Sequence, residues 1–421
     1  TLAIASLTPL FTFAFGTLTA PDSGLIFCGT LAVFWASQEF FPAASDPRVD
    51  VQPITPGSYR PTYRITLISV ALGLACISKY HGFLLGLGLV LFCLSHRSYR
   101  RALISPWLGL GLVLFAITLF PLWWWGWQTD WLSFQFHLGL RFESEAANRF
   151  SLLQLLGVFG VGLAYLFPSI GLPLWWASLK SLSARAPRQA LLLWVGLPMA
   201  AGFTLLGGMK HIFPAWPAPG LWWLTPLLGY YAAQWPQRRV QRWIRLSGWT
   251  IATLLTIAFL HVTLGLFQKG SPYAPLGGFI APRQDPINEL IDTVQLQQRL
   301  QADPTLAQPL ANADFVFTNE FFLGGYFGMA LHDVTHAPVT SLTQDPRGFA
   351  QWFNPAEQVG NNAVYITPER EHTADITDSF RPYFTQFRFL GSVSTTRQGI
   401  VTNTFYLYEG IDMRQAYPYP Y

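Results

Sequence analysis

Long apolar stretches alternate with short polar connections over residues 1–267. Nine stretches can be delimited: 1–19, 24–42, 65–78, 82–95, 104–125, 152–178, 190–207, 214–234 and 246–267. About 20 apolar residues cross a bilayer as an α-helix, so most of the stretches are long enough. The stretches at 65–78 and 82–95 are shorter and need residues from their flanks. The pattern predicts an α-helical polytopic membrane domain of about nine spans.

A polar module follows the membrane domain. Residues 268–286 form a linker rich in Gly and Pro, and residues 287–421 show mixed periodicity. Apolar residues recur at helical spacing over 287–300. Four runs have the composition of β-strands: 314–318, 363–367, 386–393 and 400–408. We expect a small C-terminal α/β domain.

The basic residues of the membrane domain set its orientation, because excess Lys and Arg marks the cytoplasmic side. Threading the apolar stretches puts the following residues on one face: Arg48, Arg60, Arg64, Arg97, Arg100, Arg101, Lys180, Arg185, Arg188, Arg238, Arg239, Arg242 and Arg245. The opposite face receives Asp22, Lys79, His81, the segment 126–150, Lys210, His211 and the C-terminal module. We therefore expect a multi-pass protein of the plasma (inner) membrane with an extracytoplasmic C-terminal domain.

Composition narrows the class of partner. The chain is 51% hydrophobic and 11% charged, whereas a soluble domain carries about 25% charged residues. The net charge of +4 is accounted for by arginines of the cytoplasmic connections, so no nucleic-acid partner is expected. Cys28, Cys76 and Cys93 lie inside apolar stretches, which favours packing over a disulfide or metal site. No motif demands a metal, although Asp22 and His81 leave a divalent ion possible.

Two candidate sites come early in the chain. Asp22 precedes a predicted helix, where it either caps the helix or faces a cavity at the outer surface. Lys79 and His81 lie between the two short stretches. A lysine there is costly in hydrocarbon unless it reaches water or pairs with an anion. It either extends to the interface or binds an anion such as phosphate.

Two further candidates lie later on the same face. The segment 130–142 has an apolar stripe at helical spacing, with Asp130, His137 and Arg141 away from it, which is typical of a helix in the membrane interface. That polar face either contacts headgroups or lines the entrance to a site for an anionic lipid. Lys210 and His211 end a predicted span and are followed by three prolines, so this lysine is also a candidate for binding an anion.

The order of these motifs resembles a known family. APDSGL at 20–25, LACISKYHGFLL at 74–85, FPLWWWGWQTDWLSFQFHLGLR at 120–141 and KHIFPAWPAP at 210–219 are similar to bacterial polyprenyl-phosphate-sugar-dependent glycosyltransferases of the GT-C fold. These are related to protein mannosyltransferases and lipid A aminoarabinose transferase. The resemblance implies that Lys79 and Lys210 contact the lipid-linked phosphate and that Asp22 is a supporting carboxylate.

One element of the family pattern is missing. The family's principal catalytic acid lies in the first outer loop, whereas this chain begins at Thr1 inside an apolar stretch. We therefore expect the natural protein to have further sequence upstream, and the main base is not among the residues here.

The leading hypothesis is a membrane glycosyltransferase that moves a sugar from a polyprenyl-phosphate donor, by inversion, to a lipid, glycan or protein acceptor on the outer face. The alternative is a non-catalytic GT-C-like subunit that acts as scaffold or lipid-binding partner in a larger membrane complex. A transporter is less favoured because the ionisable residues gather at one surface instead of the midplane.

Overall fold

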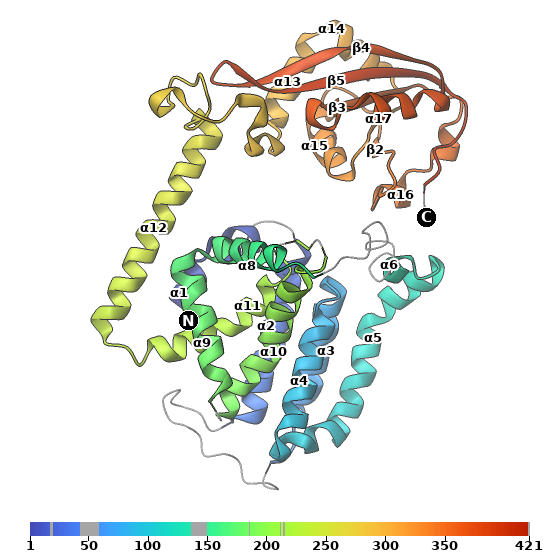
Figure 1. Cartoon of the computed structure of the whole chain (residues 1–421). Helices are drawn as coiled ribbons and strands as arrows, with labels where there is room; N and C mark the ends of the chain where they lie inside the picture. The colour runs from blue at the N-terminus through green and yellow to red at the C-terminus, as the bar shows by residue number, and fades with distance from the viewer. Residues whose placement is uncertain are drawn as a thin grey trace. The chain divides into compact units, whose positions relative to one another are not determined.

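The computed structural model describes residues 1–16, 20–42, 59–135, 150–184, 186–210, 212–213 and 215–419. The chain forms two compact units, Thr1–Ala252 and Thr253–Tyr421 (Figure 1). The first unit is helical, and the second combines helices with a five-stranded sheet.

The helices up to residue 264 follow the apolar stretches, and the last of them, α12, runs from the first unit into the second. They are α1 (Leu2–Leu7), a π-helical turn (Leu10–Ala14), α2 (Pro21–Phe40), α3 (Arg64–Ser78), α4 (Gly82–Ser95), a 3₁₀ segment (Arg97–Ile104), α5 (Pro106–Gln128), α6 (Leu132–Gln135), α8 (Leu152–Leu166), α9 (Pro168–Leu182), α10 (Pro187–Leu206), α11 (Ala218–Ala232) and α12 (Gln237–Leu264). Within the described ranges, α5, α10 and α12 are long and apolar enough to cross a membrane, and the bent pair α8–α9 would make a fourth span.

Two predicted stretches are interrupted. The stretch 1–19 holds two short helical pieces. The stretch 152–178 holds α8 and α9, and the chain bends by 114° between these two helices. Proline explains the second break. Pro168 has no N–H to donate and disfavours helical backbone at the preceding residue, and the backbone of Phe167 is not helical, with φ 60° and ψ 132°. Apolar periodicity alone does not register such a break.

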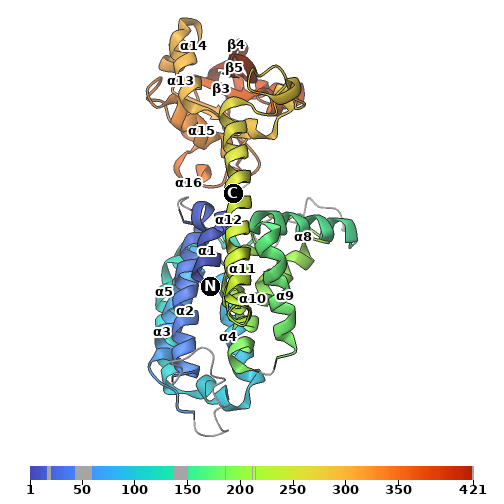
Figure 2. The same ribbon diagram turned by 90° about the vertical axis from the view of Figure 1, so that its left-hand side faces the viewer.

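Close helix contacts at glycine hold the first unit together. A Cβ at Gly88 of α4 would overlap the backbone of Trp194 in α10, and a Cβ at Gly220 of α11 would lie 2.6 Å from the nitrogen of Ala200. Small residues let helix backbones approach in this way in membrane proteins. As a result α10 packs closely against both α4 and α11 (Figures 1 and 2).

The second unit is built on a mixed sheet with strand order β2-β1-β3-β5-β4. Its elements are α13 (Thr293–Ala302), α14 (Pro304–Asn312), β1 (Phe315–Thr318), α15 (Phe321–Leu331), β2 (Val339–Ser341), α16 (Phe349–Trp352), β3 (Ala363–Pro368), α17 (Ala374–Ser379), β4 (Phe384–Arg397) and β5 (Ile400–Met413). Strands β2, β1 and β3 are parallel, whereas β5 is antiparallel to both β3 and β4.

Alternation along the strands supplies two cores, one on each face of the sheet. Val316 of β1 packs with residues of α13, α14 and α15, while Phe315 and Phe317 pack on the opposite face with Phe353 and Phe380. Successive strand side chains point to opposite faces, so a strand buried on both sides is apolar throughout.

The four predicted strand runs coincide with β1, β3, β4 and β5, but the helix expected over 287–300 is wrong at its start. A 3₁₀ turn occupies Pro286–Glu289, and α13 begins at Thr293 because the Asp292 carboxylate accepts a hydrogen bond from the Gln295 N–H at 2.9 Å. The edge strand β2 and the helices α14 to α17 were not predicted.

Candidate functional site

Asp22 and Lys79 form a partly buried ion pair in the first unit. The Lys79 ammonium donates to both carboxylate oxygens of Asp22, at 2.7 and 2.8 Å. The Asp22 side chain is 9% exposed and that of Lys79 is 19% exposed. These residues are 57 positions apart in the sequence, so packing of α2 against α3 brings them together.

Local sequence explains the placement of both residues. Pro21 occupies the first position of α2, where its missing N–H costs nothing, and Asp22 lies in the first turn, where a carboxylate favours the helix dipole. Gly24 follows on α2, and a Cβ there would lie within 3.0 Å of the Ser78 Cβ at the end of α3. The glycine therefore lets the end of α3 approach α2, and Lys79 comes directly after Ser78.

The structure bears on the simpler interpretation of each residue. The N-cap position of α2 is Ala20, which makes no side-chain capping bond, so Asp22 does not act as the cap. The Lys79 ammonium binds the Asp22 carboxylate, and whether Lys79 binds an anion or extends to the interface stays a prediction.

His81 packs against two aromatic residues, Phe203 and Trp216, which lie before and after Lys210 in the sequence. Its ring is 4.5 Å from the Phe203 ring, in an edge-on arrangement, and 5.7 Å from the Trp216 ring. Phe203 and Trp216 also contact each other, at 5.3 Å. Phe203 belongs to α10 and Trp216 to the connection before α11, so His81 packs against both flanks of the connection that carries Lys210. The Lys210 N–H donates to the Leu206 carbonyl at 2.9 Å, and its side chain is half-buried.

The interfacial helix expected over 130–142 is wrong at its start. Asp130 and Trp131 have φ of 49° and 60°, so they form a turn, and α6 begins at Leu132. The Asp130 carbonyl accepts a hydrogen bond from the Gln135 side chain at 2.7 Å. His137, Arg141 and His211 lie outside the described residues.

Sequence reasoning missed two residues of this region. The Tyr80 hydroxyl forms a hydrogen bond of 2.7 Å with the Ser133 hydroxyl, and its ring lies 5.2 Å from the ring of Phe134. The tyrosine thereby ties the turn between α3 and α4 to α6. Its position between Lys79 and His81 was the available signal, but a tyrosine at an interface is usually explained by its amphipathic ring.

Another buried carboxylate marks the far end of α2. Glu39 is 2% exposed and accepts hydrogen bonds from the Tyr59 hydroxyl at 2.7 Å and the Thr62 N–H at 2.9 Å. Neutral donors satisfy this carboxylate, whereas a cation binds Asp22. We therefore assign Glu39 a structural role.

Metal ligands do not cluster in the part of the chain that the structure describes, where no three His, Cys, Asp or Glu side chains are placed to share an ion. Cys76 and Cys93 are buried free thiols in α3 and α4, and Cys28 is a partly buried one in α2.

Comparison with known proteins places the fold. No protein-family model and no curated protein sequence matches the chain. Two crystal structures match: ArnT from Cupriavidus metallidurans in the apo state, with a TM-score of 0.52 and 13% identity over 96% of this chain and 78% of that chain, and ArnT bound to undecaprenyl phosphate, with a TM-score of 0.53 and 14% identity over 96% and 77%. The chain therefore has a GT-C-like fold, in agreement with the resemblance of its motifs.

Proposed function

We propose that the protein is a multi-pass membrane glycosyltransferase that transfers a sugar from a polyprenyl-phosphate donor to an acceptor on the outer face of the inner membrane. The observation that carries the proposal is the partly buried contact between Asp22 and Lys79 in a chain with a GT-C-like fold. The ArnT structure with undecaprenyl phosphate supports a lipid phosphate as the ligand.

The chemistry assigns a role to each charge. When the bond between the sugar and the phosphate breaks, negative charge grows on the departing polyprenyl phosphate and needs a preorganised cation. Lys79 supplies that cation, and Lys210 adds a second. Because Asp22 now neutralises Lys79, an incoming phosphate competes for the ammonium and leaves the carboxylate able to accept a hydrogen bond from an acceptor hydroxyl. The product has inverted configuration, since one displacement suffices.

Replacing only Asp22 or only Lys79 would change the stability of the protein as well as its ligand binding. Removing one partner of a buried ion pair leaves the other charge unpaired, at about 2–3 kcal/mol for groups that keep some solvent contact. The test therefore uses Asp22→Asn combined with Lys79→Met, which removes both charges at similar volume, with Lys79→Arg in the wild-type background as the control that keeps a cation.

We expect the double variant to fold, to lose binding of undecaprenyl phosphate and to lose transfer from a polyprenyl-phosphate sugar by more than about 100-fold, as for loss of a group that stabilises developing charge. Binding is measured with radiolabelled undecaprenyl phosphate on the full chain in detergent. Unchanged lipid binding by a folded double variant would contradict the phosphate role of Lys79.

A non-catalytic subunit is the second candidate, and the same pair is the observation that favours it. A buried ion pair that is satisfied at both ends can be purely structural. In that case the double variant would still bind its membrane partners and the lipid phosphate, and the charge-swapped pair Asp22→Lys with Lys79→Asp would behave like the wild type. Loss of lipid binding in the swapped variant would contradict a purely structural role of the pair, and retained transfer activity would contradict the non-catalytic subunit.

A further inference from the structure

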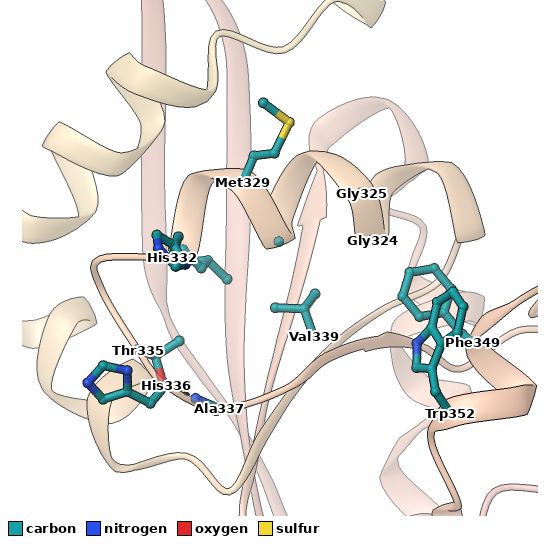
Figure 3. Close-up of a pocket in the computed structure, with 12 residues that line it drawn as sticks. Gly324, Gly325, Met329, His332, Thr335, His336, Ala337, Val339, Phe349 and Trp352 are labelled. Atoms are coloured by element: carbon teal, nitrogen blue, oxygen red, sulfur yellow. Dashed lines mark hydrogen bonds between the residues drawn. The ribbon is translucent and has the colours of Figure 1, made fainter. Parts of the chain in front are cut away.

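The second unit contains a cavity that the transfer chemistry does not use. It has a volume of 910 Å³ and lies between α15, the loop that follows it, β2 and α16. We call it the α15 groove. It is lined by Gly324, Gly325, Gly328, Met329, Leu331, His332, Thr335, His336, Ala337, Val339, Phe349 and Trp352, most of which are labelled in Figure 3. Its size falls in the range of small-molecule sites, about 300–1,000 Å³.

Three glycines of α15 form part of the floor of the α15 groove. Gly324, Gly325 and Gly328 lie on α15, and a Cβ at Gly325 or Gly328 would meet nothing within 4 Å. Glycine weakens a helix interior compared with alanine. Packing within the unit accounts for Gly324, because the Phe349 ring lies against it. The other two glycines leave this part of the helix surface open, and no packing within the unit accounts for them.

Aromatic side chains form one end of the groove. Trp352 is 71% exposed, and its ring contacts Phe349 edge-on at 5.5 Å (Figure 3). A Cβ at Gly348 would lie 2.7 Å from the indole, so the backbone supports the ring from behind. The result is a fixed aromatic face that is open to solvent, although a large apolar ring usually avoids that position.

Polar groups form the other end. His332 and His336 lie across the groove from Trp352 in Figure 3. The Thr335 hydroxyl accepts a hydrogen bond from the Ala337 N–H at 3.0 Å, which fixes the turn that carries His336. Each imidazole offers both a donor and an acceptor. None of the described residues that line the groove is Asp, Glu, Lys or Arg, so the lining selects a neutral ligand.

We infer that the α15 groove binds a neutral saccharide. The apolar C–H face of a sugar ring stacks on the indole, and its hydroxyls bond to the imidazoles and to water in the open groove. An alkyl chain fits less well, since it requires a closed apolar slot. The inference that the α15 groove binds a saccharide stands without the proposed function. The further inference that this saccharide is part of the acceptor rests on the proposed function.

The test measures binding without any transfer reaction. The full chain in detergent is applied to an array of neutral oligosaccharides of two to four glucose, galactose, mannose or N-acetylglucosamine units, and the best ligand is titrated by calorimetry. We expect Trp352→Ala to weaken binding by at least about tenfold, as for loss of an aromatic anchor, and Gly328→Trp, which fills the open floor, to abolish it. Phe389→Ala, an exposed aromatic on β4, is the control and leaves binding unchanged.

Two outcomes overturn the inference: no array member binds the wild type, or the groove variants bind saccharide as well as the control does. Binding of an extended-peptide array that is lost in the same variants would assign the groove to a peptide instead. The Asp22→Asn, Lys79→Met double variant separates the two proposals, because it keeps saccharide binding while losing undecaprenyl phosphate.

Discussion

In the second unit, the carboxylate of Asp285 is surrounded by basic side chains from distant parts of the sequence. Arg397 donates to the Asp285 carboxylate at 2.8 Å and to the Asn288 side chain at 3.1 Å. The Phe267 N–H donates to Nδ1 of His261, and Nε2 of the same ring lies 3.1 Å from the Asp285 carboxylate. Two side chains far apart in the sequence, His261 and Arg397, thus meet at one carboxylate that is 1% exposed.

The pKa of Asp285 predicts an acid-sensitive fold. Burial opposes ionisation of this carboxyl, but the hydrogen bonds from Arg397 and the Ile287 N–H and the charges of His261 and Arg397 outweigh it, so its pKa lies below the ordinary 3.8. The unfolded chain therefore binds this proton first as the pH falls. The stability that Asp285 contributes is complete above pH 3.8 and is lost on further acidification toward the lowered value.

Replacing Asp285 by Asn tests this sign. We expect the free energy of unfolding at pH 7 to fall by about 2–4 kcal/mol, since Arg397 loses a buried anion, and the slope of stability against pH below 4 to flatten. Thermal unfolding of wild type and variant between pH 3 and 7 measures both. Asp375→Asn, in the first turn of α17, is the control. An equal slope in wild type and Asp285→Asn would show that another carboxyl carries the acid limb.

Elements were predicted well where their signal is local. Helices α3 and α4 lie within a residue of the expected stretches, and β1 and β3 match the expected runs closely. Elements failed where a single residue breaks a periodic pattern, as Asp292 does at the start of α13, or where glycines dilute the pattern, as in α15. A periodicity averages over several residues, whereas a cap or a break depends on one.

The glycines of α15 give a prediction at this scale. Gly325→Ala should raise the free energy of unfolding by about 0.5–1 kcal/mol, because alanine favours the helix and its Cβ meets open space. Gly324→Ala should lower it, because the Cβ would displace the Phe349 ring. Chemical denaturation of the two matched variants measures the difference. Equal effects of both would mean that Phe349 moves aside freely and that the glycine floor is not rigid.

At the scale of the whole molecule, the two proposed binding sites lie in different units. The pair Asp22–Lys79 lies within Thr1–Ala252, and the α15 groove lies within Thr253–Tyr421. The residues named for each proposed site belong to one unit, so we expect each site to respond to its ligand when the other site is disabled.

Ligand-dependent unfolding tests that independence. Undecaprenyl phosphate at 100 times its dissociation constant should stabilise the wild type by about 2.7 kcal/mol through mass action and raise its unfolding temperature. We expect Trp352→Ala to show the same shift and the Asp22→Asn, Lys79→Met variant to show none. Scanning calorimetry of the full chain gives the measurement. A shift lost in Trp352→Ala would instead show that the two sites are coupled.

Local regularities of the chain were sufficient to predict a helical, apolar first part, the strands of a C-terminal α/β unit and the candidate residues Asp22 and Lys79, because apolar periodicity and isolated charges are visible over a few neighbouring positions. Tertiary structure alone decided that Asp22 and Lys79 bind each other and that α15, β2 and α16 line a groove. These features depend on contacts between segments distant in the sequence, and the energy of such contacts is set by packing that no local pattern records.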